Sequence, residues 1–137
     1  MPRISLLATI FAGLAAAGCA ARPDGASLAG RSWQLVALDE QASPPGAGGR
    51  PATLEFDTVA TPASGFAGCN RYAGPYTRSG GGLTFGPLVS TRMACVDGDA
   101  LERRFLAALA EVSTYTVSDS ILTLRTPGGS LLRFVPR

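Results

Sequence analysis

Hydrophobic and polar residues alternate along several short stretches of the chain, a period of two that indicates half-buried β-strands. The stretches with this alternation are residues 32–38, 53–58, 114–119, 121–126 and 131–136. In the first of them, Trp33, Leu35 and Ala37 share the predicted inward face. Two glycine-interrupted extended segments, 66–78 and 83–95, lie between the second and third stretches. We therefore expect an antiparallel sheet of about six to eight strands.

One segment of the chain has a helical period instead. Between residues 97 and 112 the apolar positions that recur at helical spacing are Leu101, Phe105, Ala108, Leu109 and Val112. This stripe predicts one amphipathic helix with a single buried face. Asp99, followed three residues later by Glu102, predicts a capping box at its start. The expected fold is α+β, a strongly bent antiparallel sheet or cracked barrel packed on one amphipathic helix.

Residues 1–18 have the features of a signal peptide. Arg3 is followed by an apolar run that is too short to span a bilayer comfortably and ends in small residues. The run leads into Gly18-Cys19-Ala20, which resembles the lipobox of bacterial lipoproteins. The resemblance implies that Cys19 becomes the first mature residue and anchors the protein to a membrane through acyl chains. Because no aspartate follows Cys19, the sorting rule of such lipoproteins implies the outer membrane, facing the periplasm.

The small and polar residues after the lipobox predict a short linker. Residues 19–27 form this tether, and the length of the remaining chain predicts a single domain over residues 28–137. Even fully extended, the tether reaches only about 30 Å. We therefore expect the domain to work close to the membrane surface, as a monomer.

The composition excludes several classes of function. The chain contains no histidine, which rules out Ser-His and Cys-His dyads and zinc sites built on imidazole. Its twelve basic residues are all arginine, are scattered along the chain, and are nearly balanced by ten acidic residues. Because no basic stripe with interleaved aromatic residues occurs, nucleic-acid binding is not predicted. We expect no catalytic residues, no cofactor and no metal site.

Two cysteines remain once Cys19 is assigned to the lipid. In an oxidising compartment, Cys69 and Cys95 are expected to form a disulfide. The chain-entropy argument assigns such a crosslink about 3.5 kcal/mol of stability. Free thiols and a redox pair remain alternatives, although the two cysteines do not form a Cys-x-x-Cys motif.

The segment GFAGCNRYAGPY around Cys69 has two interpretations. In the first, its asparagine forms a turn and its two tyrosine rings cover the sheet, so that the segment is structural. In the second, arginines near both ends of the crosslink present a small cationic, aromatic-rimmed surface to an anionic partner. The residues of this candidate binding surface are Asn70, Arg71, Tyr72, Tyr76 and Arg92.

Four motifs together resemble the META domain family, which includes heat-shock lipoproteins of the HslJ type. They are LAGRSWQL, GCNRYAGPY, STRMAC and LTL…LLRF, within about residues 28 to 135. The family's marked positions map to Cys69, Asn70, Tyr72, Gly74, Tyr76, Thr91, Met93, Ala94 and Cys95. The resemblance implies a bent antiparallel sheet on one helix, in secreted or lipid-anchored proteins linked to envelope stress and sometimes to secretion or motility. It implies no established enzymatic activity.

Three hypotheses for function follow. The leading one is a non-enzymatic, lipid-anchored envelope protein that binds a protein partner or stabilises other proteins under stress. The second is a barrel that binds a small apolar ligand, which an unfilled internal cavity would favour. The third is a hydrolase using Glu55 and Asp57, which lie two apart on a predicted strand and so on one face. Protection of this carboxylate pair from solvent would favour the hydrolase.

Overall fold

The computed structural model describes residues 28–58 and 62–137. The predicted signal peptide, the predicted lipidation site Cys19 and the tether lie outside the described residues. Within the two described ranges, no helix is both long enough and apolar enough to cross a membrane.

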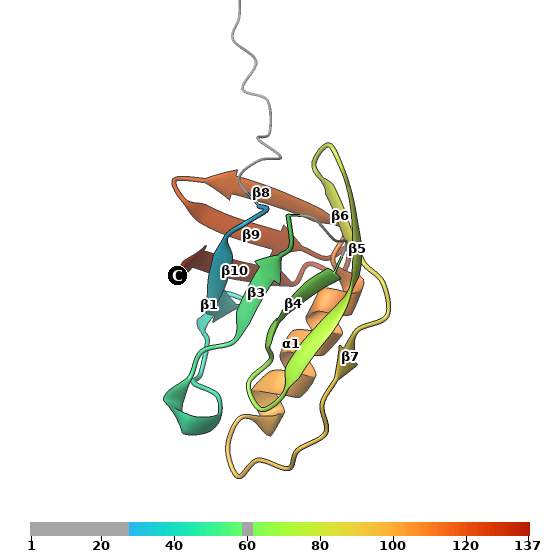
Figure 1. Ribbon diagram of the computed structural model, residues 1–137. Helices are drawn as coiled ribbons and strands as arrows, with labels where there is room; N and C mark the ends of the chain where they lie inside the picture. Colours follow the sequence, from blue (N-terminus) through green and yellow to red (C-terminus); the bar gives the residue numbers. More distant parts are fainter. Residues whose placement is uncertain (1–27, 59–61) are drawn as a thin grey trace, which may run out of the picture.

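In the described part of the chain, eight antiparallel strands close into a barrel (Figure 1). In chain order they are β1 (Ser32–Leu38), β3 (Thr53–Phe56), β4 (Pro62–Phe66), β5 (Arg71–Ser79), β6 (Gly82–Phe85), β8 (Thr114–Ser118), β9 (Ile121–Arg125) and β10 (Leu131–Pro136). Each strand pairs with the next in this order, and β10 pairs with β1 to close the ring. The predicted α+β fold with a barrel-like sheet on one helix is confirmed.

Two short strands pair with the barrel without belonging to its ring. Strand β2 (Gln41–Ala42) pairs with β1, and β7 (Val89–Ser90) pairs with the first half of β5. The single-turn helix η2 (Ala47–Gly49) lies in the proline- and glycine-rich loop before β3. Helix α1 (Asp99–Glu111) connects the segment after β7 to β8.

The inward face of β1 differs from the simple alternation expected. Leu35 pairs with Phe134, but Ala37 pairs with Arg133, so the register shifts between Leu35 and Ala37. As a result Leu38 points into the core and is 2% exposed, whereas Ala37 is only half-buried. The prediction that Ala37 lies on the inward face is therefore wrong, because a bulge moves every later side chain to the other face.

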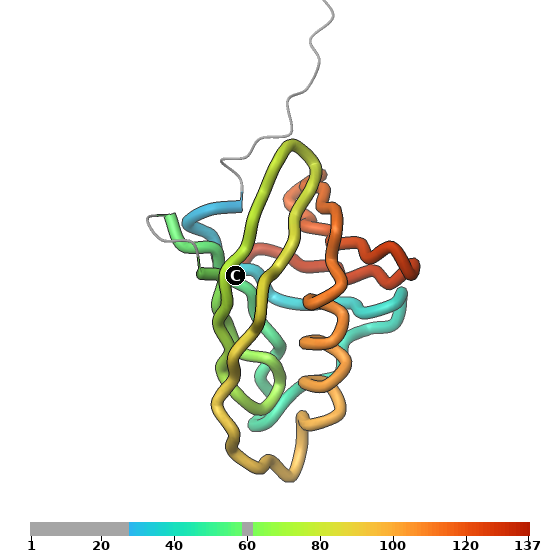
Figure 2. The backbone as a smooth tube through the Cα atoms, turned by 90° about the vertical axis from the view of Figure 1, so that its right-hand side faces the viewer, coloured from blue at the N-terminus to red at the C-terminus, as the bar shows by residue number. Residues whose placement is uncertain are grey.

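Helix α1 runs beside the strands (Figure 2), and one of its side chains contacts strands on opposite sides of the barrel ring. The ring of Phe105 makes edge-to-face contacts with Tyr72 of β5 and Phe134 of β10, with centroids 5.6 Å and 6.3 Å apart. Phe105 itself is fully buried. The predicted stripe thus forms part of one core, which it shares with Trp33, Leu35, Leu54, Leu83, Leu122, Leu124 and Leu132.

Candidate functional site

The segment between β6 and α1, residues 86–98, runs beside the helix and is called the strap below. A disulfide joins it to the chain before β5. Cys69 and Cys95 are bonded, with their Cα atoms 5.9 Å apart. The predicted crosslink is confirmed, and it fixes the C-terminal part of the strap next to the start of α1.

Asn70 holds the middle of the strap. Its side-chain nitrogen donates to the carbonyl oxygen of Met93 at 3.2 Å, and its side-chain oxygen accepts from the Met93 amide at 2.7 Å. The same oxygen also accepts from the hydroxyl of Thr91 at 3.1 Å. Asn70 is only 4% exposed, so these bonds are shielded from water. A side-chain amide carries a donor nitrogen and an acceptor oxygen side by side, which matches the N–H and C=O of Met93 and explains the residue type at this position.

The carboxylate of Glu102 connects the same loop to α1. Its Oε2 accepts hydrogen bonds from the amides of Cys69 and Asn70, at 3.1 Å and 2.5 Å. Its Oε1 accepts from the side-chain nitrogen of Asn70 at 2.9 Å. The Sγ of Cys69 also lies 3.3 Å from the Met93 carbonyl oxygen, but this is a contact only, since a disulfide sulfur carries no hydrogen.

The predicted capping box is wrong, because Glu102 is engaged with this loop and not with its own helix end. The residue before α1 is Gly98, which has a positive φ of 97° and makes no side-chain capping bond. A Cβ at Gly98 would lie 2.2 Å from the carbonyl oxygen of Gly68, so only glycine permits this close approach. Glycine therefore allows the helix start and the Cys69 loop to pack backbone against backbone.

The two tyrosines of the GFAGCNRYAGPY segment belong to the core. The hydroxyl of Tyr72 donates to the carbonyl oxygen of Thr53 at 2.8 Å, and its side chain is 3% exposed. Burial raises the pKa of Tyr72 well above its ordinary value, and the charge of Glu55 acts in the same direction. The ring of Tyr76 is half-buried, with its centroid 5.0 Å from that of Phe56.

The candidate binding surface predicted from the sequence is therefore not formed as expected. Asn70 and Tyr72 are buried and cannot offer their side chains to a partner. Arg71 and Arg92 are exposed. The amide of Thr91, the residue before Arg92, donates to the carbonyl oxygen of Arg71 at 3.0 Å, so the strap passes close to Arg71 at this point. Of the five predicted residues, only these two arginines remain fully at the surface.

The strap carries the most exposed large apolar side chains among the described residues. Val89 and Met93 are 73% and 64% exposed, and Val96 is fully exposed. Between the strap and the first turns of α1 lies an open cleft of about 660 Å³. Its walls are formed by Asn70, residues 88–94 of the strap, and Asp99, Glu102 and Arg103 of the helix. The strap and its cleft form the candidate functional site.

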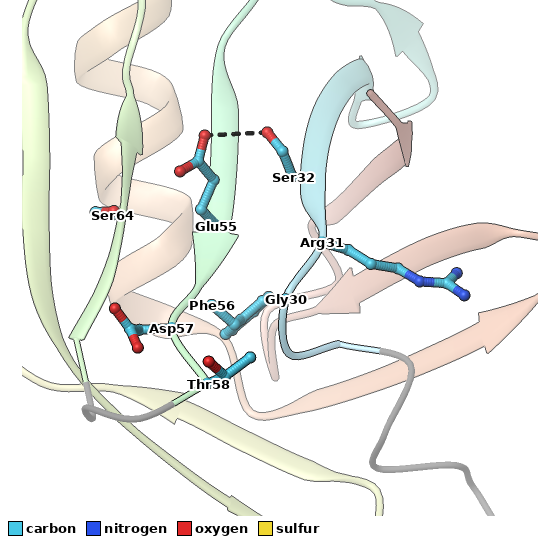
Figure 3. A pocket seen from close by; sticks show the side chains of 8 residues that line it. All are labelled: Gly30, Arg31, Ser32, Glu55, Phe56, Asp57, Thr58 and Ser64. Atoms are coloured by element: carbon cyan, nitrogen blue, oxygen red, sulfur yellow. Dashed lines mark hydrogen bonds between the residues drawn. The ribbon is translucent and has the colours of Figure 1, made fainter.

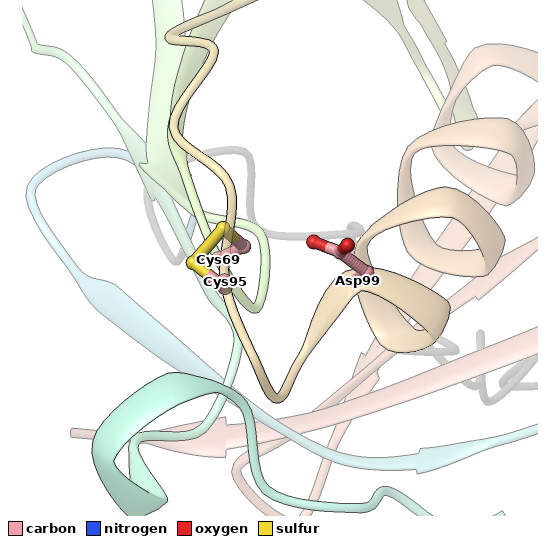
Figure 4. A group of neighbouring side chains, drawn as sticks. All are labelled: Cys69, Cys95 and Asp99. Carbon is pink, nitrogen blue, oxygen red and sulfur yellow. A yellow bond between two sulfur atoms is a disulfide. The ribbon is translucent and has the colours of Figure 1, made fainter.

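Asp99 lies beside the disulfide, and its carboxylate points toward the two sulfur atoms (Figure 4). The carboxylate oxygen and both sulfurs lie within 4.8 Å of one another, a spacing that could suit a metal ion. A metal binds cysteine as a thiolate, however, and both cysteines are here in a disulfide. The arrangement does not fit a metal centre in this oxidised form.

The carboxylates of the proposed hydrolase, Glu55 and Asp57, line a separate hollow of about 360 Å³ (Figure 3). Glu55 is half-buried and accepts a hydrogen bond from the hydroxyl of Ser32 at 3.0 Å. Asp57 lies beyond the end of β3 and is exposed. The two carboxylates are not both protected from solvent, and such protection is the observation that would favour a hydrolase.

The interior of the barrel is filled with side chains. The largest fully buried ones include Trp33, Phe105 and Phe134. The alternative of an apolar ligand held inside the barrel therefore gains no support from the packing of the described residues.

Comparison with known proteins identifies the family. The META domain pattern matches residues 26–137, which include the disulfide, the Asn70 network and the strap. The chain belongs to the META domain family. No curated protein matches it.

Solved structures resemble the whole META domain. An NMR structure of a protein from Burkholderia xenovorans has a TM-score of 0.71 and 30% identity, covering 100% of this chain and 99% of that one. A second NMR structure has a TM-score of 0.61 and 24% identity, covering 79% of this chain and 91% of the other. A crystal structure of a DUF4847 family protein from Bacteroides vulgatus has a TM-score of 0.58 and 14% identity, covering 79% and 93%. At these two lower identities, the likeness shows the fold alone.

In this META domain, the two signature segments meet around one side chain. Cys69 and Asn70 of the first segment bind Thr91, Met93 and Cys95 of the second, directly or through the disulfide. The sequence analysis did not find Glu102 as the third partner, nor the exposure of Val89 and Val96. The signal for Glu102 was ambiguous, because a glutamate in a first helical turn is also the usual partner of a cap.

Proposed function

We propose that this META-domain protein is a non-enzymatic, lipid-anchored protein of the bacterial cell envelope that binds a partner protein through the strap, in a stress-related role. One observation carries the proposal. The three most exposed large apolar side chains of the described residues, Val89, Met93 and Val96, all lie on the strap. Methionine and arginine are enriched at protein interfaces, and Arg92 is exposed between the first two of these side chains.

The fixed backbone of the strap supports its binding role. An apolar side chain in water contributes little to the stability of its own fold, so core packing does not account for these residues. The disulfide and the Asn70 network nevertheless hold the backbone of the strap in one conformation. A surface that is already ordered loses less conformational entropy on binding, which increases its affinity for a partner.

The position of the first described residues fits anchoring through Cys19. The first described residues enter β1 at the end of the molecule opposite the lower turn of the strap (Figures 1 and 2). A lipid on Cys19, joined by a tether of at most about 30 Å, would place the membrane at that end. The disulfide end of the strap would then face the periplasm, where a partner can reach it.

Site-specific crosslinking in the native envelope tests the proposal. A photoreactive amino acid at Met93 is expected to form adducts with one or a few envelope proteins. The matched control is the same amino acid at Ile121, an exposed apolar side chain outside the strap, which is 40% exposed. Equal adduct patterns from both positions, or no adducts from Met93, would contradict the proposed function.

The anchor is tested separately. Mass spectrometry of the protein isolated from membranes is expected to show cleavage before Cys19 and acylation of that residue. The Cys19→Ser variant is expected to leave the membrane fraction. An intact, unmodified N-terminus would contradict the lipid-anchored part of the proposal.

A further inference from the structure

We infer that the outer edge of β7 is a site for strand addition, at which an extended, acidic peptide segment of a partner protein pairs with the strap inside the cleft. The inference deepens the proposed function and rests on it only for the partner's presence in the envelope. It concerns backbone groups of the strap as well as its exposed side chains.

The hydrogen-bond pattern between β5 and β7 shows which backbone groups point outward. Ser90 stands opposite Tyr72 and Val89 opposite Ala73, and continuing this register by one residue places Thr91 opposite Arg71. Because the Thr91 amide donates to the Arg71 carbonyl, Arg71 and Thr91 form a hydrogen-bonded pair. Such pairs alternate along an antiparallel ladder, so the amide and carbonyl of Ser90 point away from β5. Extended past the end of β7 at Ser90, the same alternation assigns the same orientation to Arg92.

These outward groups border the cleft and have no partner of their own. Ser90 and Arg92 both line the cleft between the strap and α1. Among the described residues, no hydrogen bond outside the strand ladders engages the amide or the carbonyl of either one. The cleft volume of about 660 Å³ lies within the usual range of binding clefts, roughly 300–1,000 Å³.

The edge is only partly protected against pairing. Proteins block such edges with short strands, charged side chains, proline, a bulge or a covering segment, and of these β7 has its two-residue length and the nearby charge of Arg92. Residues 88–96 contain neither proline nor lysine. Val89, Met93 and Val96 are exposed, so no described segment covers them. The strap therefore presents the kind of edge to which an extended peptide adds as a further strand.

Charge and side-chain alternation define the chemistry of the peptide. On β7 and its continuation, Ser90 and Arg92 share one face and Val89 and Met93 the other. Arg92 and Arg103 both line the cleft and form no salt bridge within the described residues. Asp99 and Glu102 also line it, and because three N–H groups already compensate the charge of Glu102, two arginines remain against the one carboxylate of Asp99. An added strand would therefore carry apolar residues beside Val89 and Met93, alternating with carboxylates that face the two arginines.

A synthetic peptide of alternating valine and glutamate provides the probe. Its binding to the acylated full-length protein in detergent is measured by fluorescence anisotropy. The Ser90→Pro variant removes the outward N–H without removing a bond to β5, and proline is tolerated at such edge positions. We expect Ser90→Pro to weaken binding at least about tenfold, because one paired amide is lost and the ring obstructs the edge. The control Ser90→Ala keeps the N–H and is expected to bind like the natural protein.

Further controls separate strand pairing from nonspecific attraction. The same peptide, N-methylated at alternate amides, keeps its charge and its side chains but cannot pair, and is expected not to bind. Arg103→Glu should weaken binding severalfold, whereas Arg133→Glu, the same change at an exposed position outside the cleft, should have no effect. Hydrogen exchange of the Ser90 and Arg92 amides should slow when the peptide is added.

Three results would overturn the inference. They are equal binding of the N-methylated peptide, equal binding by the Ser90→Pro variant, and a dimer of the protein that only Ser90→Pro dissociates, since a second copy would then occupy the edge. The peptide assay is independent of crosslinking at Met93. Peptide binding without an envelope adduct would reject the proposed function alone, and an adduct that Ser90→Pro does not reduce would reject the strand-addition site alone.

Discussion

The carboxylate of Glu102 accepts hydrogen bonds from both the backbone amide and the side-chain amide of Asn70, at 2.5 Å and 2.9 Å, although Asn70 lies 32 residues earlier in the chain. Through Asn70 the same carboxylate reaches the strap, because Asn70 also binds both backbone groups of Met93. The helix, the loop before β5 and the strap are therefore joined at a single buried amide. This junction holds one wall of the cleft against the other.

Removing the Glu102 carboxylate should destabilise the protein. Glu102→Ala leaves the amides of Cys69 and Asn70 without their acceptor, in a place that is largely closed to water. We expect the free energy of unfolding to fall by about 2–4 kcal/mol, as for other partly buried hydrogen bonds to a charge. Urea denaturation measures the change. The control is Arg103→Ala, which removes the exposed side chain that follows Glu102 and should change the free energy of unfolding by less than about 0.5 kcal/mol. A similar loss in both variants would contradict the prediction.

Loss of the crosslink should both destabilise the fold and loosen the strap. The double change Cys69→Ala and Cys95→Ala opens a loop with a sequence separation of 26 residues. The chain-entropy argument gives a loss of about 3.5 kcal/mol in the free energy of unfolding. Hydrogen exchange at Met93 and its neighbours should also become faster, relative to the centre of α1. Unchanged exchange in the strap would show that the Asn70 network alone holds it.

The helix stripe should carry core stability. Phe105 is fully buried and contacts both Tyr72 and Phe134, so Phe105→Ala leaves a cavity between opposite walls of the barrel. We expect a loss of about 3–5 kcal/mol, measured by a thermal melt or by denaturant. Arg104→Ala is the control: its ion pair with Asp39 is 3.8 Å long and exposed, and such pairs contribute at most about 1 kcal/mol. A normal melting midpoint for Phe105→Ala would rule out the core role.

Buried Tyr72 should make the fold sensitive to alkaline pH. Its pKa is raised in the folded state, first by burial and then by the charge of Glu55, so the folded protein holds this proton more tightly than the unfolded chain. The contribution of Tyr72 to the free energy of unfolding is therefore constant below about pH 10, the ordinary tyrosine pKa. Above that pH it falls by up to about 1.4 kcal/mol per pH unit.

The variant Tyr72→Phe isolates this effect. It removes the ionisable group together with the hydrogen bond to Thr53, so it should be less stable at neutral pH but lose less stability between about pH 10 and 11. Because the chain has no lysine, few other groups titrate in this range. Parallel pH profiles for the two proteins, from denaturant titrations, would contradict the assignment.

The strands and the helix were predictable because their signals are local. The alternation in residues 121–126 and 131–136 and the stripe around Phe105 each follow from the geometry of one element. The inward position of Ala37 was predicted wrongly for the same reason. The bulge in β1 arises from its pairing with β10, and the residue pattern of β1 alone does not predict it.

The candidate site was less predictable from the sequence than the strands and the helix. The motif around Asn70 was visible in the sequence, but the choice between a core position and a surface position was not. Whether a polar side chain is buried depends on which distant groups satisfy its hydrogen bonds, and for Asn70 these come from α1 and from the strap. Arg71, the next residue and the first of β5, faces solvent.

By itself, the sequence determined the α+β class, the helix stripe, the pairing of Cys69 with Cys95 and the exclusion of histidine chemistry. These depend on periodicity, on composition and on a choice among few cysteines. Only the tertiary structure decided that β10 closes the barrel on β1, that Tyr72 is core, and that Val89 and Met93 stand in water beside an open cleft. The physical reason is that burial and open strand edges are relations between segments far apart in the chain, set by how the whole sheet curls around α1.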